Sequence, residues 1–205
     1  MLKLYIVRHG ETEYNVQKRM QGSIDSPLTE RGKAHAKDLR NHLQGVRFDK
    51  IYSSPSERAC KTAEIIRGEA VIPIQIENEF REMNLVHWEG KSREELTALY
   101  PEEHDRFWDS PHLHQLEGGD TFQEVQERAV AMLYKLIHEN KNGNILIVTH
   151  SVVILTISLF FRQLPIERLW EPPYIHDTSV TLLAAEQGEA RLEYIGDISH
   201  IKQER

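Results

Sequence analysis

The sequence predicts a three-layer α/β/α fold, in which a mostly parallel central sheet carries helices on both faces. Short apolar runs rich in β-forming residues alternate with amphipathic stretches of helical period along most of the 205 residues. Several of these runs end directly in a turn or a helix start. Alternation of this kind is typical of parallel strands joined by crossover helices, which places helices on both faces of the sheet.

Six segments have the composition of strands. The first is a short apolar run closed by Gly10, which is typical of a buried strand that ends in a tight turn. The last two surround a turn at Gln187-Gly188. In chain order, the expected strands are residues 4–7, 48–53, 72–77, 144–149, 178–185 and 191–194.

Five segments carry the start and stop signals of helices. Thr29 is the expected N-cap of the first helix, and Gly68 follows the end of the second. Capping boxes open three helices, at Ser54, Ser92 and Thr121, each with a glutamate three residues later. At Ser54 the next residue is proline, which favours the first helical position. The expected helices are residues 29–43, 55–67, 92–100, 121–137 and 152–161.

A cationic side chain or an imidazole follows three of the expected strands. Arg8 and His9 follow the first strand, Arg58 lies in the first turn of the helix after the second, and His150 follows the strand at 144–149. Ligands of open α/β sheets bind at the carboxyl ends of strands. If these three strands are parallel neighbours, the four side chains meet at one edge. Two arginines, two histidines and a helix N-terminus form a pocket for an anion.

Charge and composition exclude several classes of protein. The net charge is −7 and no cluster of Lys and Arg is present, which argues against a nucleic-acid partner. A small phosphorylated substrate remains compatible, because a local cationic pocket can lie in an acidic protein. The longest apolar run, residues 152–161, is shorter than the roughly 20 residues that span a bilayer, so no membrane partner is expected.

The chain is expected to be a single domain over residues 1–205, since no linker, repeat or low-complexity tract interrupts it. The apolar run at the start is broken by Arg8 and does not resemble a signal peptide. Cys60 is the only cysteine, which excludes an internal disulfide and favours a reducing, cytoplasmic compartment.

Five motifs, in order, resemble those of the histidine phosphatase superfamily, the group that includes the cofactor-dependent phosphoglycerate mutases. The first is Arg-His-Gly-Glu-Thr, and together the motifs span nearly the whole chain. They lie at residues 8–15, 26–32, 53–63, 81–90 and 149–150, and the segments at 19–22 and 170–174 look most like the bacterial broad-specificity phosphatases of the PhoE type. The resemblance implies a phosphoglycerate mutase-like α/β fold and a phosphomonoester hydrolase.

The resemblance also implies a mechanism. His9 would attack phosphorus and form a phosphohistidine, which requires one unprotonated ring nitrogen and a hydrogen bond that holds the other. Arg8, Arg58 and His150 would bind the phosphoryl oxygens and stabilise their charge in the transition state. Glu82 would protonate the leaving oxygen and then accept a proton from water, a role that requires a desolvated carboxyl with a raised pKa. No metal or cofactor is implied, because the arginines supply the positive charge.

Four further residues match positions that contact substrate in this family. Asn15, Gln21 and Gly22 are expected to line the pocket, together with Ser151. The family usually has glycine after the second histidine, where this chain has Ser151. The backbone amide can still donate to phosphate there, while the side chain either narrows the pocket or adds a hydrogen bond through its hydroxyl.

Two other functions are compatible with these motifs. A phosphoglycerate mutase needs cations beyond the phosphate pocket, and the segment after the acid donor, residues 83–88, is mostly apolar here. A non-catalytic phospholigand-binding module usually lacks the nucleophile or the acid, and both are present. The sequence therefore favours hydrolysis with broad specificity for small phosphorylated metabolites, and leaves the natural substrate, the oligomeric state and any protein partner open.

Two structural questions stay open in the sequence. Glu77, Glu79 and Glu89 lie near Glu82, and spacing alone does not choose the proton donor among them. Residues 102–119 are expected to form much of the cover over the site, as longer connections often do.

Overall fold

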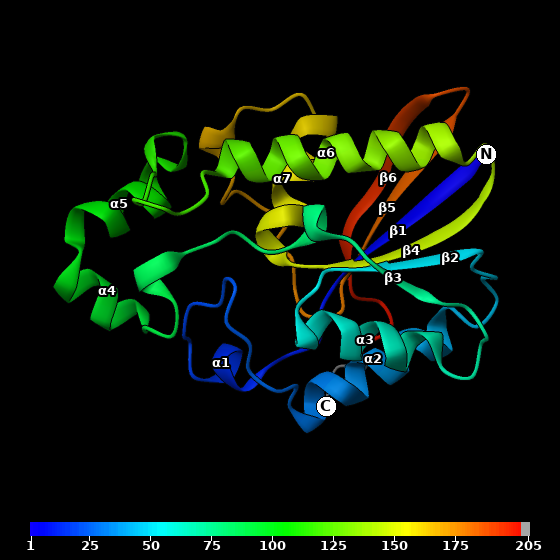
Figure 1. Cartoon of the computed structure of the whole chain (residues 1–205), viewed down its shortest axis with the longest axis horizontal. Helices are drawn as coiled ribbons and strands as arrows, with labels where there is room; N and C mark the ends of the chain where they lie inside the picture. The colour runs from blue at the N-terminus through cyan, green and yellow to red at the C-terminus, as the bar shows by residue number, and fades with distance from the viewer. Residues whose placement is uncertain (202–205) are drawn as a thin grey trace.

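A six-stranded sheet forms the middle layer of the computed structural model, which describes residues 1–201 (Figure 1). The strand order is β3-β2-β4-β1-β5-β6, in which β1 to β4 pair in parallel and β5 and β6 are antiparallel. The strands are β1 (Leu2–Arg8), β2 (Lys50–Ser53), β3 (Ile74–Ile76), β4 (Gly143–Thr149), β5 (Val180–Glu186) and β6 (Glu189–Asp197). The predicted mostly parallel sheet is confirmed. The predicted domain also includes residues 202–205, which lie outside the described part.

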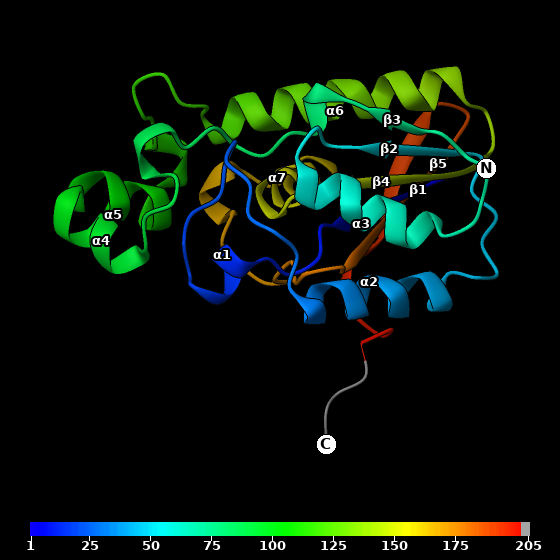
Figure 2. The same ribbon diagram turned by 60° about the horizontal axis from the view of Figure 1, so that its bottom comes forward.

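Helices cover both faces of this sheet, which confirms the predicted three layers (Figures 1 and 2). One face carries α2 (Glu30–His42) and α3 (Glu57–Arg67), and the other carries α6 (Phe122–Glu139) and α7 (Ser151–Phe161). The remaining helices are α1 (Glu13–Val16), α4 (Arg93–Leu99) and α5 (Pro101–Asp109), with short 3-10 turns at Asn78–Phe80, Val86–Trp88, Pro111–Leu113 and Ile166–Arg168. Across residues 1–201, the helices are all too short or too polar to cross a bilayer.

Alternate residues of β1 supply the two halves of the core. Leu4 and Ile6 pack into the apolar cluster that includes α6 and α7, whereas Tyr5 and Val7 pack into the cluster that includes α2 and α3. Successive side chains of a strand point to opposite faces, so a continuous apolar run is buried on both. This is why the apolar run at the start of the sequence forms a central strand.

Three of the four predicted helix starts with capping residues are confirmed. Thr29 caps α2, and capping boxes are present at Ser92 for α4 and at Thr121 for α6. Gly68 ends α3 with a φ of 59°, a conformation that glycine adopts without strain. Local side-chain-to-backbone hydrogen bonds therefore define these ends, as the sequence indicated.

The prediction that Ser54 caps the following helix is wrong. α3 begins at Glu57, and its N-cap is Ser56, whose side chain accepts from the backbone N–H of Ala59. The backbone N–H of Ser54 still donates to the Val148 carbonyl at 2.9 Å, so the pairing of β2 with β4 continues through Ser54. The two closely spaced serines are equivalent as cap candidates in the sequence, and the sheet decides between them.

The segment at residues 102–119, which was expected to cover the site, packs part of its residues into the core. Phe107 of α5 is 1% exposed, and its ring centroid lies 5.3 Å from Trp88 and 5.1 Å from Phe122. The His114 ring lies 4.9 Å from that of Phe107 and 5.3 Å from that of Trp88. Burial of these rings draws the segment against α6, and no residue of it lines the cavity described below.

Candidate active site

Parallel strands bring two of the predicted site histidines together. His9 follows β1 and His150 follows β4, and these strands are in register up to Arg8 and Thr149. The backbone N–H of His9 donates to the Thr149 carbonyl at 2.9 Å, so the ladder holds His9 beside β4. The two imidazole centroids lie 5.2 Å apart, at an interplanar angle of 61°.

Arg58 reaches this edge of the sheet from the first turn of α3 and is 1% exposed. Its guanidinium donates to the carbonyls of Gly22 and Ile24, both at 2.9 Å, and to Asp25 Oδ1 at 2.6 Å. Nη2 also lies 3.3 Å from Nδ1 of His150. These contacts fix Arg58 between the loop at residues 22–25 and the second histidine.

Arg8 and Arg58 each have a buried hydrogen-bond donor without a partner among the described residues. Nη1 of Arg8 donates to the Ile175 carbonyl at 2.7 Å. The Nε atoms of Arg8 and Arg58 are buried and have no hydrogen-bond partner within residues 1–201. Buried donors are rarely left unpaired, since each one loses its hydration without compensation. An anion bound between these side chains would satisfy them.

His9 has the protonation state of a nucleophile. Its Nδ1 lies 2.8 Å from the Gly10 carbonyl oxygen, which can only accept, so Nδ1 carries the proton. Nε2 is then the unprotonated nitrogen. Burial, followed by the charges of Arg58 and Arg8, holds the pKa of His9 well below its ordinary value, so the ring is neutral. One nitrogen is thus oriented by a hydrogen bond while the other keeps its lone pair.

His150 is neutral as well, with the opposite tautomer. The Arg58 guanidinium can only donate, so Nδ1 of His150 accepts and Nε2 carries the proton. Nε2–H donates to Ser54 Oγ at 2.7 Å, with Ser56 Oγ at 3.4 Å. Burial, and then Arg58, lowers the pKa of His150 well below its ordinary value. Ser54 was not among the expected site residues. The signal that could have identified it is its position directly after a strand, which His9 and His150 share.

Glu82 is the glutamate that the structure brings into the site. It is 8% exposed, and its oxygens accept from the backbone N–H groups of Met83 at 3.0 Å and Val152 at 3.4 Å. Burial raises the pKa of Glu82, although the Met83 amide and the charge of Arg58 oppose this shift. A carboxyl with a raised pKa holds its proton to higher pH than an ordinary carboxyl and can then release it.

The neighbouring glutamates do not compete for this role. The carboxylate of Glu89 accepts from the backbone N–H groups of Ser23 at 2.7 Å and Ile24 at 2.9 Å, and therefore braces the loop at 22–25. Glu77 and Glu79 do not line the cavity. Burial and position therefore favour Glu82 among these glutamates.

A cavity of about 280 Å³ opens beside Glu82. Three segments line it: the loop after α1, the turn between β2 and α3, and the chain that carries the acid. The lining residues are Gly22, Ser23, Asp25, Ser54, Pro55, Ser56, Arg81, Glu82 and Asn84. Its volume fits a small metabolite.

The other residues that were expected to contact substrate do not all line the cavity. Gly22 lines the cavity, whereas Asn15 and Gln21 bind Thr12: the Asn15 oxygen accepts from the Thr12 backbone at 3.0 Å and Gln21 Nε2 donates to the Thr12 hydroxyl at 2.7 Å. These bonds shape the loop after His9. Ser151 is the first residue of α7 and is half-buried.

We expect Gly22→Ala to impair both stability and catalysis. An added Cβ would lie 2.5 Å from the Met83 carbonyl oxygen and closer still to Oε1 of Glu89. Such crowding is expected to lower the free energy of unfolding by about 1–3 kcal/mol and to displace the chain next to Glu82. Denaturant titration and phosphate-release assays would measure both effects. Gly45→Ala is the matched control, since no atom lies within 4 Å of its added Cβ; equal behaviour of the two variants would contradict the expectation.

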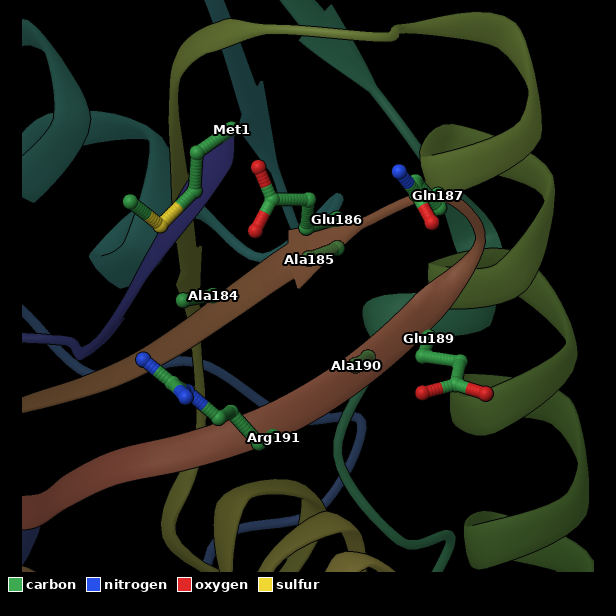
Figure 3. Close-up of a pocket in the computed structure, with 8 residues that line it drawn as sticks. All are labelled: Met1, Ala184, Ala185, Glu186, Gln187, Glu189, Ala190 and Arg191. Carbon is green, nitrogen blue, oxygen red and sulfur yellow. The ribbon is translucent and has the colours of Figure 1, made fainter.

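A second hollow, of about 350 Å³, lies at the far end of the sheet (Figure 3). The tip of the β5–β6 hairpin lines it together with Met1, where β1 begins. It contains Arg191 and Glu186 but none of the predicted site residues. The carboxyl ends of the parallel strands therefore remain the candidate site.

Comparison with known proteins agrees with this geometry. A family model described as histidine phosphatase superfamily (branch 1) matches residues 4–198. Phosphoserine phosphatase 1 of Hydrogenobacter thermophilus is 32% identical over 170 residues, which are 83% of this chain and 81% of that protein. A protein named uncharacterized phosphatase PhoE, from Bacillus subtilis, is 33% identical over 154 residues, 75% of this chain and 74% of its own. Among solved structures, Bacillus stearothermophilus YhfR superposes with a TM-score of 0.96 at 42% identity, covering 98% of this chain and all of its own.

Proposed function

This chain belongs to branch 1 of the histidine phosphatase superfamily, and on that premise we propose that its site hydrolyses small phosphomonoesters through a phosphohistidine on His9. One observation carries the proposal. His9 is held neutral with Nε2 unprotonated, at the same sheet edge as a buried carboxyl, Glu82, whose pKa is raised. A nucleophile and a proton donor are thus present together in the forms that the first step needs.

In the first step, the Nε2 lone pair of His9 forms a bond to phosphorus as the bond from phosphorus to the leaving oxygen breaks. Glu82 gives its proton to that oxygen, so the product leaves as an alcohol. The unpaired Nε–H groups of Arg8 and Arg58 bind the phosphoryl oxygens, and His150 joins them by turning its Nε2–H from Ser54 Oγ to phosphate. Because the arginine donors are already in place, they stabilise the transition-state charge without reorganisation.

In the second step, water attacks phosphorus and the bond between phosphorus and Nε2 breaks. Glu82, now a carboxylate, accepts the proton of the attacking water. Inorganic phosphate leaves, and His9 and Glu82 return to their starting forms. The arginines supply the positive charge throughout, so the proposal includes no metal or cofactor.

Broad specificity for small phosphorylated metabolites is part of the proposal. The cavity has room for a small leaving group, and Arg81 is the one lysine or arginine among its lining residues. Arg81 is itself paired with Asp120, at 3.4 Å. A mutase substrate with several negative charges would find few free cations there. The relatives are named for different substrates, phosphoserine and α-ribazole among them. The acidic net charge and the single cysteine favour a small metabolite as partner and the cytoplasm as compartment.

We expect kcat/KM for alkyl phosphates to be highest on the acidic side of neutrality. His9 must be neutral, and its lowered pKa keeps it so well into the acidic range. Glu82 must be protonated, and its raised pKa keeps it protonated to higher pH than an ordinary glutamate. Activity therefore falls as pH rises through the pKa of Glu82. A pH series with ethyl phosphate would measure this limb, and p-nitrophenyl phosphate, whose leaving group needs little protonation, should show a shallower one. Identical profiles for the two esters would contradict the assignment.

The proposal is tested by following where the phosphoryl group goes. Wild-type protein in excess EDTA is incubated with ethyl phosphate or p-nitrophenyl phosphate, and separately with a phosphoglycerate. We expect inorganic phosphate to appear in each case without an added metal. Isomerisation of the phosphoglycerate faster than phosphate release would instead identify a mutase. Absence of both reactions would refute the proposal.

A further inference from the structure

Arg128, on the inner side of α6, binds the backbone of the segment that carries Glu82. Its Nη1 donates to the carbonyl of Glu79 at 2.6 Å and to that of Arg81 at 2.7 Å, and its Nη2 donates to the carbonyl of Glu82 at 3.2 Å. The side chain is only 13% exposed. One guanidinium thus binds three carbonyls within four residues, an arrangement that its planar set of donors permits.

Asp120 completes this clamp from the residue just before the N-cap of α6. Its Oδ2 accepts from the backbone N–H of Asn84 at 3.0 Å and lies 3.5 Å from Nη2 of Arg128. The backbone N–H of Asp120 donates in turn to the Asn84 carbonyl at 3.1 Å. The segment is therefore bound on both sides of Glu82.

The segment has no regular structure of its own to hold it. The 3-10 turn Asn78–Phe80 ends before Glu82, and the next begins at Val86. Beyond the clamp, the Phe80 carbonyl accepts from Thr149 Oγ1 at 2.7 Å, and the side chains of Phe80 and Met83 are buried in the core. Without Arg128, the carbonyls of Glu79, Arg81 and Glu82 would lose this donor and would take other partners, including water.

We propose that Arg128, held by Asp120, is a positioning residue that fixes the Glu82 carboxyl against the leaving oxygen. The inference rests on the proposed function, since it gives Arg128 a role only if Glu82 is the proton donor. Arg128 does not touch the substrate in this account. Its loss should therefore affect proton transfer more than phosphoryl binding.

The test compares two substrates that differ in their need for an acid. Ethyl phosphate has a poor leaving group and depends on protonation, whereas p-nitrophenyl phosphate depends on it little. Misplacement of a catalytic group by about 1 Å can cost roughly 10²-fold, so we expect Arg128→Met to lower kcat/KM for ethyl phosphate by about 10²-fold and to change it far less for the aryl ester. The alkaline limb of the ethyl phosphate profile should also flatten.

Three variants make the result specific. Arg128→Lys keeps the charge but cannot bind three carbonyls at once, so it should recover part of the discrimination, and it carries the test if Arg128→Met does not fold. Lys135→Met, at an exposed position of the same helix, should behave as wild type. Glu82→Gln sets the full size of the acid effect.

Each outcome distinguishes the inference from the function on which it rests. If Arg128→Met loses equal activity on both esters, Arg128 has a merely structural role. If it loses activity on neither ester, the clamp is dispensable. Either result would overturn the inference, provided that Glu82→Gln still loses more activity on ethyl phosphate than on the aryl ester. If Glu82→Gln itself fails to discriminate, the proton-donor assignment is wrong and the inference fails with it. A larger loss on ethyl phosphate than on the aryl ester, in both Arg128→Met and Glu82→Gln, supports the inference.

Discussion

His9→Ala is expected to abolish phosphate release, with a fall in kcat of at least about 10⁴-fold, the scale on which removal of a covalent nucleophile acts. The ring is the only side chain in the proposed reaction that forms a bond to phosphorus, and the lone pair of the neighbouring His150, on Nδ1, is bound to Arg58. Within residues 1–201 the imidazole makes one side-chain hydrogen bond, to the carbonyl of Gly10, so its removal should leave the fold intact. Colorimetric phosphate assays on the folded variant measure the loss.

A matched control tests whether the loss of activity is specific to His9 or follows from removal of any histidine side chain. His138 is exposed on α6, so His138→Ala should retain wild-type activity. Thermal unfolding of both variants checks that each is folded. If folded His9→Ala releases phosphate at more than a small fraction of the wild-type rate, another group is the nucleophile and the two-step reaction is wrong.

Glu82→Gln has the second largest expected effect. A positioned general acid contributes about 10²–10⁴-fold, so kcat/KM for ethyl phosphate should fall by that factor. The fall for p-nitrophenyl phosphate should be much smaller, because its leaving oxygen needs little protonation. The alkaline limb of the ethyl phosphate profile should disappear as well, since the group whose raised pKa produces it is gone.

The control for this variant is Glu79→Gln. Glu79 lies three residues away, does not line the cavity and contributes its carbonyl to Arg128 through the backbone, which the substitution keeps. It should retain the selectivity of the wild type between the two esters. A larger selective loss in Glu79→Gln than in Glu82→Gln would reassign the proton donor.

Much of the fold could be predicted because its main signals are local. The apolar run at residues 4–7 is buried on both faces in a parallel sheet, and the caps at Thr29, Ser92 and Thr121 each depend on residues at most four positions apart. The meeting of Arg58, His9 and His150 followed from a single rule, that parallel strands place their carboxyl ends along one edge. Short-range chemistry and sheet topology were sufficient for these features.

What could not be predicted depends on contacts between distant parts of the chain. Ser54 is a plausible cap until the continued pairing with Val148 and the bond to His150 give it another role. The aromatic rings that draw residues 102–119 into the core make their contacts with Trp88 and Phe122, outside that segment. The clamp from Arg128 to the Glu82 segment has no signature in either sequence segment alone.

The most direct test of the account is to trap the phosphorylated protein. Wild-type protein is mixed with radiolabelled substrate, quenched within the first turnover and digested, and the labelled peptide is sequenced. We expect label on His9, stable to alkali and lost in acid as a phosphohistidine is, with none trapped on His9→Ala. A wild-type protein that turns over substrate with no trapped label, or with acid-stable label on a serine such as Ser54, would contradict the phosphohistidine mechanism.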